Sequence, residues 1–237
     1  MRLPTTSALV LALVAAVGSI VFTQTPQAPA LSDVYSVHFL KAAPGQAAAL
    51  GESVKEPDTS APMPDHFVVL RHQEGDDWDF AIIRHLGATA TIEPGPPAAT
   101  AATPDPGVVS WHSDAYVSGP SWPEFTKQMG LGGSGAAGAV YTLGIHNPVP
   151  GHANDLMTLL SAPASSAADI EMGGVFMRHI DGGPWLFLTI SRYNSWQDFA
   201  ADRAAAAADA SATGWADIRQ HSAFHRDTVA DRIFPAR

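Results

Sequence analysis

One ten-residue pattern occurs twice in this chain, and no other feature limits the possible folds as strongly. The first copy runs from Arg71 to Phe80 (RHQEGDDWDF) and the second from Arg178 to Phe187 (RHIDGGPWLF). Both copies read Arg-His, one variable residue, an acid, Gly, two variable residues, Trp, one variable residue and Phe. A polar, Gly-containing turn between two apolar runs is typical of a β-hairpin. The chain is therefore expected to contain two equivalent hairpins.

Other landmarks of the chain recur at almost the same spacing. The two hairpin copies are 107 residues apart, two earlier landmarks recur after 106 residues, and two later ones recur after 109. These landmarks are Val34-Tyr35 with Val140-Tyr141, Pro44-Gly45 with Pro150-Gly151, His112-Ser113 with His221-Ser222, and Phe125 with Phe234. A spacing that drifts by only a few residues predicts a tandem duplication with small changes in the loops.

The duplication divides the chain into two units of similar length. We expect the first unit to span residues 31–129, a Gly-rich linker to span 130–139, and the second unit to span 140–237. Each unit reads β-α-β-β-α-β, which is the split βαβ pattern. Residues 87–107 are rich in Ala, Thr and Pro and lack large side chains, so this segment of the first unit is predicted to be a loop.

The predicted strands carry apolar residues at consecutive positions, as in Phe67 to Leu70 and Trp185 to Leu188. Strands of this kind are buried on both faces. The helices of each unit cover one face of its sheet, so the sheet of the other unit must cover the second face. The sequence therefore predicts an α+β fold in which two tandem ferredoxin-like units pack sheet to sheet. We expect a monomer with an internal pseudo-dimer.

The first 30 residues predict an export signal. Arg2 precedes an apolar run from Leu9 to Phe22, and Ala28-Pro29-Ala30 has the small-x-small pattern of a signal-peptidase site. The apolar run is shorter than the roughly 20 residues that span a bilayer. We expect a periplasmic or secreted protein that begins near Leu31 and is not stably inserted in the membrane. A retained anchor is the alternative.

Composition excludes several classes of function. The chain has 237 residues and no cysteine, which excludes a disulfide framework, a lipoprotein anchor and a thiolate metal site. Its formal net charge of -10 leaves no basic patch to displace counterions from phosphates, so we expect no nucleic-acid partner. There is no Gly-x-Ser-x-Gly nucleophile motif and no phosphate-binding Gly loop with its Lys.

The repeated hairpins supply the candidate ligand-binding residues. Neighbouring Arg and His side chains point to opposite faces of a strand, so one of each pair faces the interior, where it would bind an anionic or carbonyl-bearing ligand. The candidates are Arg71, His72, Trp78, Arg178, His179 and Trp185. In the alternative interpretation each Arg pairs with the acid of its own turn, Glu74 or Asp181, and the Trp side chains belong to the core.

Histidines supply the candidate catalytic residues. A helical segment predicted after Gly214 places His221 and His225 four residues apart on one face, a spacing used for zinc and other transition metals. His112 is the expected counterpart of His221. These three residues are the catalytic candidates, and His221 and His225 are also the candidate metal ligands. In the alternative interpretation they are ordinary residues at the end of an amphipathic helix.

Three features resemble those of a known superfamily. They are the opening strand and Pro-Gly turn of each unit (Val34 to Gly45 and Val140 to Gly151), the two hairpins, and the helix entry Ser195 to Phe199. The chain resembles the dimeric α+β barrel superfamily, and its helix entry is similar to those of antibiotic-biosynthesis-monooxygenase-like and NIPSNAP-like domains. That superfamily includes cofactor-free monooxygenases, haem-degrading enzymes and haem peroxidases. In the haem peroxidases a helical His is the proximal ligand, a role to which His221 or His225 would correspond.

Two interpretations of the function remain open. In the first, the protein binds a small molecule and is a monooxygenase-like or haem-dependent oxidoreductase, with His221 as general base or axial ligand and Arg178 as the anion holder. In the second, it is a non-catalytic periplasmic binding or stress-related protein whose histidines are structural. The cofactor is equally open, because haem, a transition metal and no cofactor are all compatible with the residues.

Overall fold

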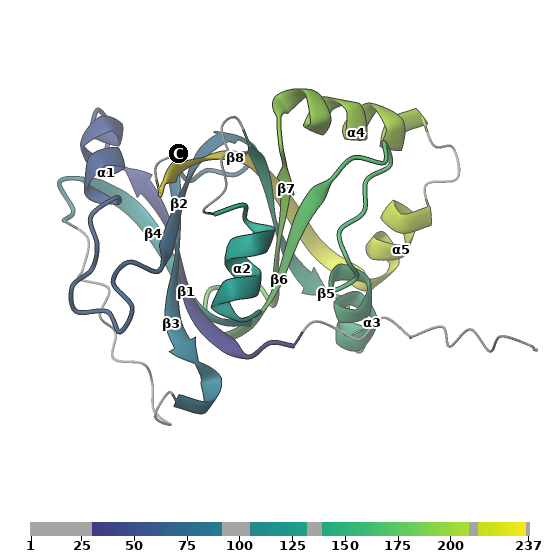
Figure 1. The fold of residues 1–237 in the computed structure, drawn as a ribbon, viewed down its shortest axis with the longest axis horizontal. Coiled ribbons are helices and arrows are strands. Elements are labelled where there is room, and N and C mark those ends of the chain that lie inside the picture. Colours follow the sequence, from purple (N-terminus) through teal and green to yellow (C-terminus); the bar gives the residue numbers. More distant parts are fainter. Residues whose placement is uncertain (1–29, 92–104, 132–138, 209–212, 236–237) are drawn as a thin grey trace, which may run out of the picture.

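Eight strands, most of them rich in β-branched and aromatic residues, pair side by side and form a closed barrel (Figure 1). The computed structural model describes residues 30–91, 105–131, 139–208 and 213–235. Residues 1–29 of the predicted export signal lie outside this range. Within it, no helix has both the length and the apolar character needed to cross a membrane.

The strands and helices follow the predicted order closely. The strands are β1 (Asp33–Ala42), β2 (Phe67–Glu74), β3 (Phe80–Ala88), β4 (Val109–Gly119), β5 (Val140–Pro148), β6 (Met172–Gly182), β7 (Phe187–Tyr193) and β8 (Ser222–Phe234). The helical elements are α1 (Ala47–Ser53), the 3₁₀ turn η1 (Thr89–Thr91), α2 (Trp122–Gln128), α3 (Ala153–Leu160), α4 (Trp196–Ala208) and α5 (Thr213–His221). At the start of α4 the Asp198 amide donates to Ser195 Oγ at 3.0 Å, as the capping pattern predicts.

The strand order confirms the α+β pseudo-dimeric barrel. One half of the barrel has the order β4-β1-β3-β2 and the other has β8-β5-β7-β6, and all neighbours are antiparallel. The halves join at two seams, where β2 pairs with β8 and β4 pairs with β6. One difference from the predicted unit is that the described residues between β3 and β4 form only η1, while α2 follows β4.

Strand pairing fixes which residues of the two units are equivalent. Leu40 pairs with His112 in the first unit, and His146 pairs with His225 in the second. Because Leu40 and His146 are the 106-residue equivalents on β1 and β5, His112 corresponds to His225, 113 residues later. The sequence alignment of His112 with His221 is therefore wrong. The connection between β7 and β8, which contains α4 and α5, is longer than its first-unit counterpart between β3 and β4. The offset between equivalent residues therefore grows from 107 at the hairpins to 113 at β4 and β8.

Alternate side chains of each strand pack inside the barrel or against the outer helices. The interior cluster includes both motif tryptophans, and every strand contributes to it. Outside, Leu50 and Val54 of α1 cover Phe67 and Val69 of β2. A second outer cluster packs α3 and α5 against β6 and β7. The central strands are thus buried on both faces, as their apolar runs predict.

Helix α2 closes one end of the barrel. In Figure 1 it lies over the middle of the barrel, between β1 and β6. Its Phe125 is fully buried in the interior cluster. Two equivalent tyrosines hold its ends, because Tyr35 donates to the Pro120 carbonyl at 2.7 Å and Tyr141 donates to the Met129 carbonyl at 2.8 Å. Burial raises the pKa of Tyr35, so this hydroxyl stays protonated and keeps its donor role.

The glycine of each repeated hairpin is required where the seams close. A Cβ atom at Gly75 would lie 2.5 Å from the Asp227 carbonyl oxygen, and one at Gly182 would lie 2.2 Å from the Asp114 carbonyl oxygen. Both glycines have positive φ, at 122° and 98°. Asp114 and Asp227 are equivalent residues of β4 and β8, so both seams use the same close backbone approach.

Gly75→Ala is expected to destabilise the barrel more than Gly45→Ala. Both glycines have positive φ, but nothing lies within 4 Å of a Cβ at Gly45. We expect the free energy of unfolding in urea to fall by about 3 kcal/mol for Gly75→Ala and by about 1 kcal/mol for Gly45→Ala. Equal losses for the two variants would show that the close approach at the seam does not limit the fold.

Candidate ligand cavity at the barrel mouth

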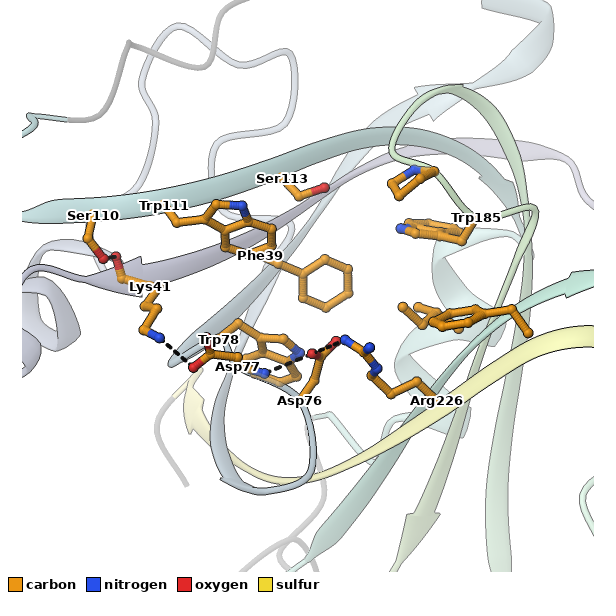
Figure 2. A pocket seen from close by; sticks show the side chains of 13 residues that line it. Phe39, Lys41, Asp76, Asp77, Trp78, Ser110, Trp111, Ser113, Trp185 and Arg226 are labelled. Atoms are coloured by element: carbon orange, nitrogen blue, oxygen red, sulfur yellow. Dashed lines mark hydrogen bonds and ion pairs between the residues drawn. The ribbon is translucent and has the colours of Figure 1, made fainter.

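The end of the barrel opposite α2 holds a cavity of about 650 Å³. It lies between the two hairpin turns and the first residues of β4 and β8. Figure 2 shows Phe39 in the middle of the lining residues, with Trp78 and Trp111 on one side and Trp185 on the other. Phe39 packs against both motif tryptophans, with ring centroids 5.3 Å from Trp78 and 6.5 Å from Trp185. The walls are therefore mainly aromatic.

Most lining residues come as equivalent pairs, one from each unit. The pairs are Phe39 with Ile145, Trp78 with Trp185, Trp111 with Phe224, Asp77 with Pro184, and Ser113 with Arg226. The cavity consequently straddles the internal pseudo-two-fold axis. In three pairs both residues are apolar or aromatic, whereas Asp77 corresponds to Pro184 and Ser113 to Arg226. The two sides of the rim therefore carry different polar and charged groups.

Two ion pairs stand at the rim of the cavity. The Arg226 guanidinium donates to the Asp76 carboxylate, and the Lys41 ammonium donates to the Asp77 carboxylate (Figure 2). The Arg226 side chain is 51% exposed and the Lys41 side chain is 38% exposed. Exposed pairs of this kind contribute little to stability. They place two cations and two carboxylates where a bound molecule would meet them.

Of the six ligand-binding candidates from the hairpins, only Trp78 and Trp185 line the cavity. His72 and His179 face inward but lie edge-on against these tryptophans, with centroid distances of 5.5 Å and 5.8 Å. Their Nε2 atoms are buried and have no hydrogen-bond partner among the described residues. The imidazoles therefore support the cavity wall from behind.

The two hairpin arginines point to the outer surface, away from the cavity. Arg71 makes a bidentate ion pair with Asp231 of β8, at 3.0 and 2.8 Å, so the predicted local pair with Glu74 is wrong. Its equivalent Arg178 stands opposite Ser118 of β4. Arg71 thus links the two units across one seam.

His112 and His225 also point away from the cavity. They lie on β4 and β8 and each donates to the carboxylate two residues further on, with His112 Nδ1 2.9 Å from Asp114 and His225 Nε2 2.9 Å from Asp227. Strand side chains alternate, so their neighbours point inward instead. The inward residues that the sequence interpretation missed are Trp111, Ser113, Phe224 and Arg226. The signal was a second repeat, Trp-His-Ser-Asp and Phe-His-Arg-Asp, at a spacing of 113.

His221 and His225 do not share a helical face. Helix α5 ends at His221 and β8 begins at Ser222, so His225 belongs to a strand. The predicted geometry of this pair is wrong because pairing with β5 extends β8 back to Ser222. His221 instead contacts His152 at the start of α3.

His225 stacks on a second histidine that the sequence interpretation did not single out. His146 of β5 lies directly opposite it, with ring centroids 5.1 Å apart and an angle of 9° between the rings. Burial lowers the pKa of His146 to about 4. The hydrogen bond that His225 donates to Asp227 raises the pKa of His225. A proton bound by this pair therefore favours His225 over His146.

The closed end of the barrel carries its own polar cluster. Asp33 accepts from the Trp122 amide at 2.9 Å and lies 2.8 Å from His85 Nε2, and His85 in turn contacts His66 through their Nδ1 atoms at 3.1 Å. The Trp122 ring stacks on both imidazoles. This cluster fixes the first turn of α2 over the barrel end. It does not line the cavity at the other end.

No histidine is among the described residues that line the cavity. The histidines proposed as haem ligands or general bases thus lie outside it, on the outer face of β4 and β8 or at the end of α5. The described groups that a molecule in the cavity can meet are aromatic rings, the apolar Ile145 and Pro184, two ion pairs and the hydroxyl groups of Ser110 and Ser113.

Comparison with known proteins supports the fold superfamily. The chain matches no protein-family model and no curated protein sequence. Among solved structures, an anthrone oxidase-like protein matches with a TM-score of 0.58 and 11% identity, covering 87% of this chain and 93% of its own. A candidate monooxygenase from Lactobacillus acidophilus NCFM matches with a TM-score of 0.50 and 10% identity, covering 85% and 94%. At these identities the likeness establishes the fold alone, an α+β barrel built from two similar halves.

The buried His146 predicts an acid-dependent loss of stability. Its pKa is about 4 in the folded protein and about 6.5 in the unfolded chain, so only the unfolded chain gains a proton between these values. The free energy of unfolding should therefore fall by about 2 kcal/mol from pH 7 to pH 5 through this residue. The equivalent position in the first unit holds Leu40, so His146→Leu is the matched variant. In urea titrations it should lack the pH-dependent fall in the free energy of unfolding that His146 causes. An unchanged pH dependence in this variant would contradict the assignment.

Proposed function

We propose that the protein binds a small, planar aromatic molecule in the cavity at the barrel mouth. The observation that carries this proposal is the set of aromatic walls contributed in equivalent pairs by both units, with Phe39 between Trp78 and Trp185. Aromatic rings attract other rings through stacked and edge-to-face contacts and bury a large apolar area. A cavity of about 650 Å³ lies within the size range of sites for drug-sized ligands.

The rim favours a ligand with an oxygen atom at one edge. A guanidinium carries five N–H donors, and the contact of Arg226 with Asp76 uses a single nitrogen, Nη1. The remaining donors are free to meet a carbonyl or phenolate oxygen. Lys41 stands at the same rim, paired with Asp77. An aromatic ketone or phenol would therefore place its ring between the tryptophans and its oxygen toward these cations.

Ligand binding is tested by truncating one aromatic wall. Trp111 is 48% exposed, so its replacement should leave the fold intact. Anthrone is the probe, and its binding is measured by the quenching of tryptophan fluorescence. We expect Trp111→Ala to weaken anthrone binding about tenfold. Trp196→Ala is the matched control, because Trp196 is 47% exposed on α4 and does not line the cavity. Equal affinities of the wild type and Trp111→Ala would contradict this site.

A second candidate function is oxidation of the bound molecule by dioxygen. It is favoured by the names of the two structural neighbours, an anthrone oxidase-like protein and a candidate monooxygenase. In such a reaction a CH₂ group between two aromatic rings loses both hydrogens. Its electrons pass to dioxygen, one oxygen atom stays on the carbon as a carbonyl, and the other leaves as water. Asp76 and Asp77 are the carboxylates near enough to accept the departing proton.

An oxygen electrode distinguishes oxidation from binding alone. If the protein is an oxidase, anthrone should be consumed with one molecule of dioxygen per molecule of anthraquinone formed, and Trp111→Ala should slow turnover at low anthrone concentration. Trp196→Ala should turn over at the wild-type rate. Tight anthrone binding without dioxygen uptake above the protein-free rate would leave the binding function and exclude this oxidation.

A further inference from the structure

Three potential metal ligands from two helices converge at the mouth end of the barrel, outside the cavity. His152 is the N-cap residue of α3, Asp155 lies in the first turn of α3, and His221 is the last residue of α5. Their ligand atoms are His152 Nδ1, His221 Nδ1 and Asp155 Oδ2, which all lie within 4.8 Å of one another. We propose that these three residues bind a divalent transition-metal ion, with Zn²⁺ as the best-fitting candidate.

The distances between the ligand atoms fit a shared ion. The two Nδ1 atoms are 2.9 Å apart, and the Asp155 oxygen is 3.2 Å from His152 Nδ1 and 3.8 Å from His221 Nδ1. Zinc bonds of about 2.0–2.1 Å in a tetrahedral arrangement place neighbouring ligand atoms roughly 3.3 Å apart. The three observed distances bracket this value, so small side-chain rotations would complete the triangle.

A single proton satisfies this arrangement only in part. A neutral imidazole carries one N–H and one lone pair, so at most one proton can lie between the two Nδ1 atoms. If both Nδ1 atoms were protonated, two N–H groups would oppose each other at 2.9 Å. If only His221 carries the proton, the lone pair of His152 Nδ1 faces the Asp155 carboxylate at 3.2 Å. If only His152 carries it, a single N–H is shared between two acceptors, His221 Nδ1 and the Asp155 carboxylate. A cation at the centre of the triangle attracts all three atoms at once.

The fold itself does not require this cluster. The first unit builds the equivalent helix α1 after the same Pro-Gly turn, and there the N-cap residue is Gln46 and the counterpart of Asp155 is Ala49. Helix α5, which carries His221, has no counterpart among the described residues of the first unit. The three ligands therefore belong to the second unit alone.

Ligand type and exposure define the ion and its environment. Two imidazoles and one carboxylate suit Zn²⁺, Cu²⁺ or Ni²⁺ better than Ca²⁺ or Mg²⁺, which prefer oxygen ligands only. The side chains of His152, His221 and Asp155 are 44%, 24% and 58% exposed. Solvent therefore reaches the fourth coordination position, where a water molecule or an external ligand would bind. The ion would also join α3 to α5.

The test is a titration of the tag-free full chain with ZnCl₂, in which binding is measured by isothermal titration calorimetry. We expect one site in the wild type and affinity losses of about 100-fold in His221→Ala and His152→Gln. His152→Gln installs the residue that stands at the first-unit position, so helix α3 keeps an N-cap that the fold already accepts. His225→Ala is the matched control and should bind Zn²⁺ as the wild type does, because His225 lies on β8 and bonds to Asp227.

Two further measurements separate metal binding from damage to the fold. Zn²⁺ should raise the melting temperature of the wild type and of His225→Ala, and it should not raise that of Asp155→Asn, whose side chain is more than half exposed. Co²⁺ should give the intense visible bands of a tetrahedral site in the wild type and should not give them in Asp155→Asn. Absence of Zn²⁺ binding in the wild type, or loss of binding in His225→Ala with retention in His221→Ala, would overturn the proposal.

Discussion

The barrel depends on two places where backbone passes so close to backbone that no side chain fits between them. Gly75 meets the Asp227 carbonyl and Gly182 meets the Asp114 carbonyl, each at the seam between the two units. These contacts set how far each hairpin turn stands from the first residues of β4 and β8. Because the mouth cavity is bounded by those same segments, its width follows from the seams. The repeated glycine is thus a requirement of closure, and the repeated Trp three residues later is placed at the mouth by it.

A single helix closes one end of this pseudo-symmetric barrel. Tyr35 and Tyr141 are equivalent, yet both donate to carbonyls at the two ends of α2, whose Phe125 fills the interior at that end. The opposite end has no such plug among the described residues, and the aromatic pairs there surround a cavity. A duplicated scaffold therefore gains one closed and one open end through one segment that occurs after β4 only.

Duplication also leaves equivalent positions free to diverge in chemistry while the packing is kept. The apolar pairs of the cavity stay apolar, but Ser113 of the first unit corresponds to Arg226 of the second. On the outer surface, Gln46 corresponds to His152, the first of the three converging metal-ligand candidates. Substitutions at such exposed positions cost little stability, so the second unit can carry a guanidinium and an imidazole there without a change of fold.

Much of the architecture was predictable because its signals are local in the sequence. The repeated hairpin, the consecutive apolar runs and the Ser195 cap each act within a few residues, and together they predict two ferredoxin-like units and buried sheets. The first-unit departure, in which α2 follows β4, was not predictable in this way. The reason is that the start of α2 is held by Tyr35, which lies 85 residues before its acceptor Pro120 in the chain.

The candidate sites depended on long-range pairing, and there the sequence was less informative. His221 and His225 have helical spacing, but β8 gains its hydrogen bonds from β5 and β2, and this pairing overrides the local helical preference. Pairing of β4 with β1 likewise decides that Trp111 faces the cavity while His112 faces outward. The sequence by itself determined the two units, their hairpins and the aromatic residues available. Only the tertiary structure decided which of them meet, because the face of a strand and the partners across a seam are set where the barrel closes.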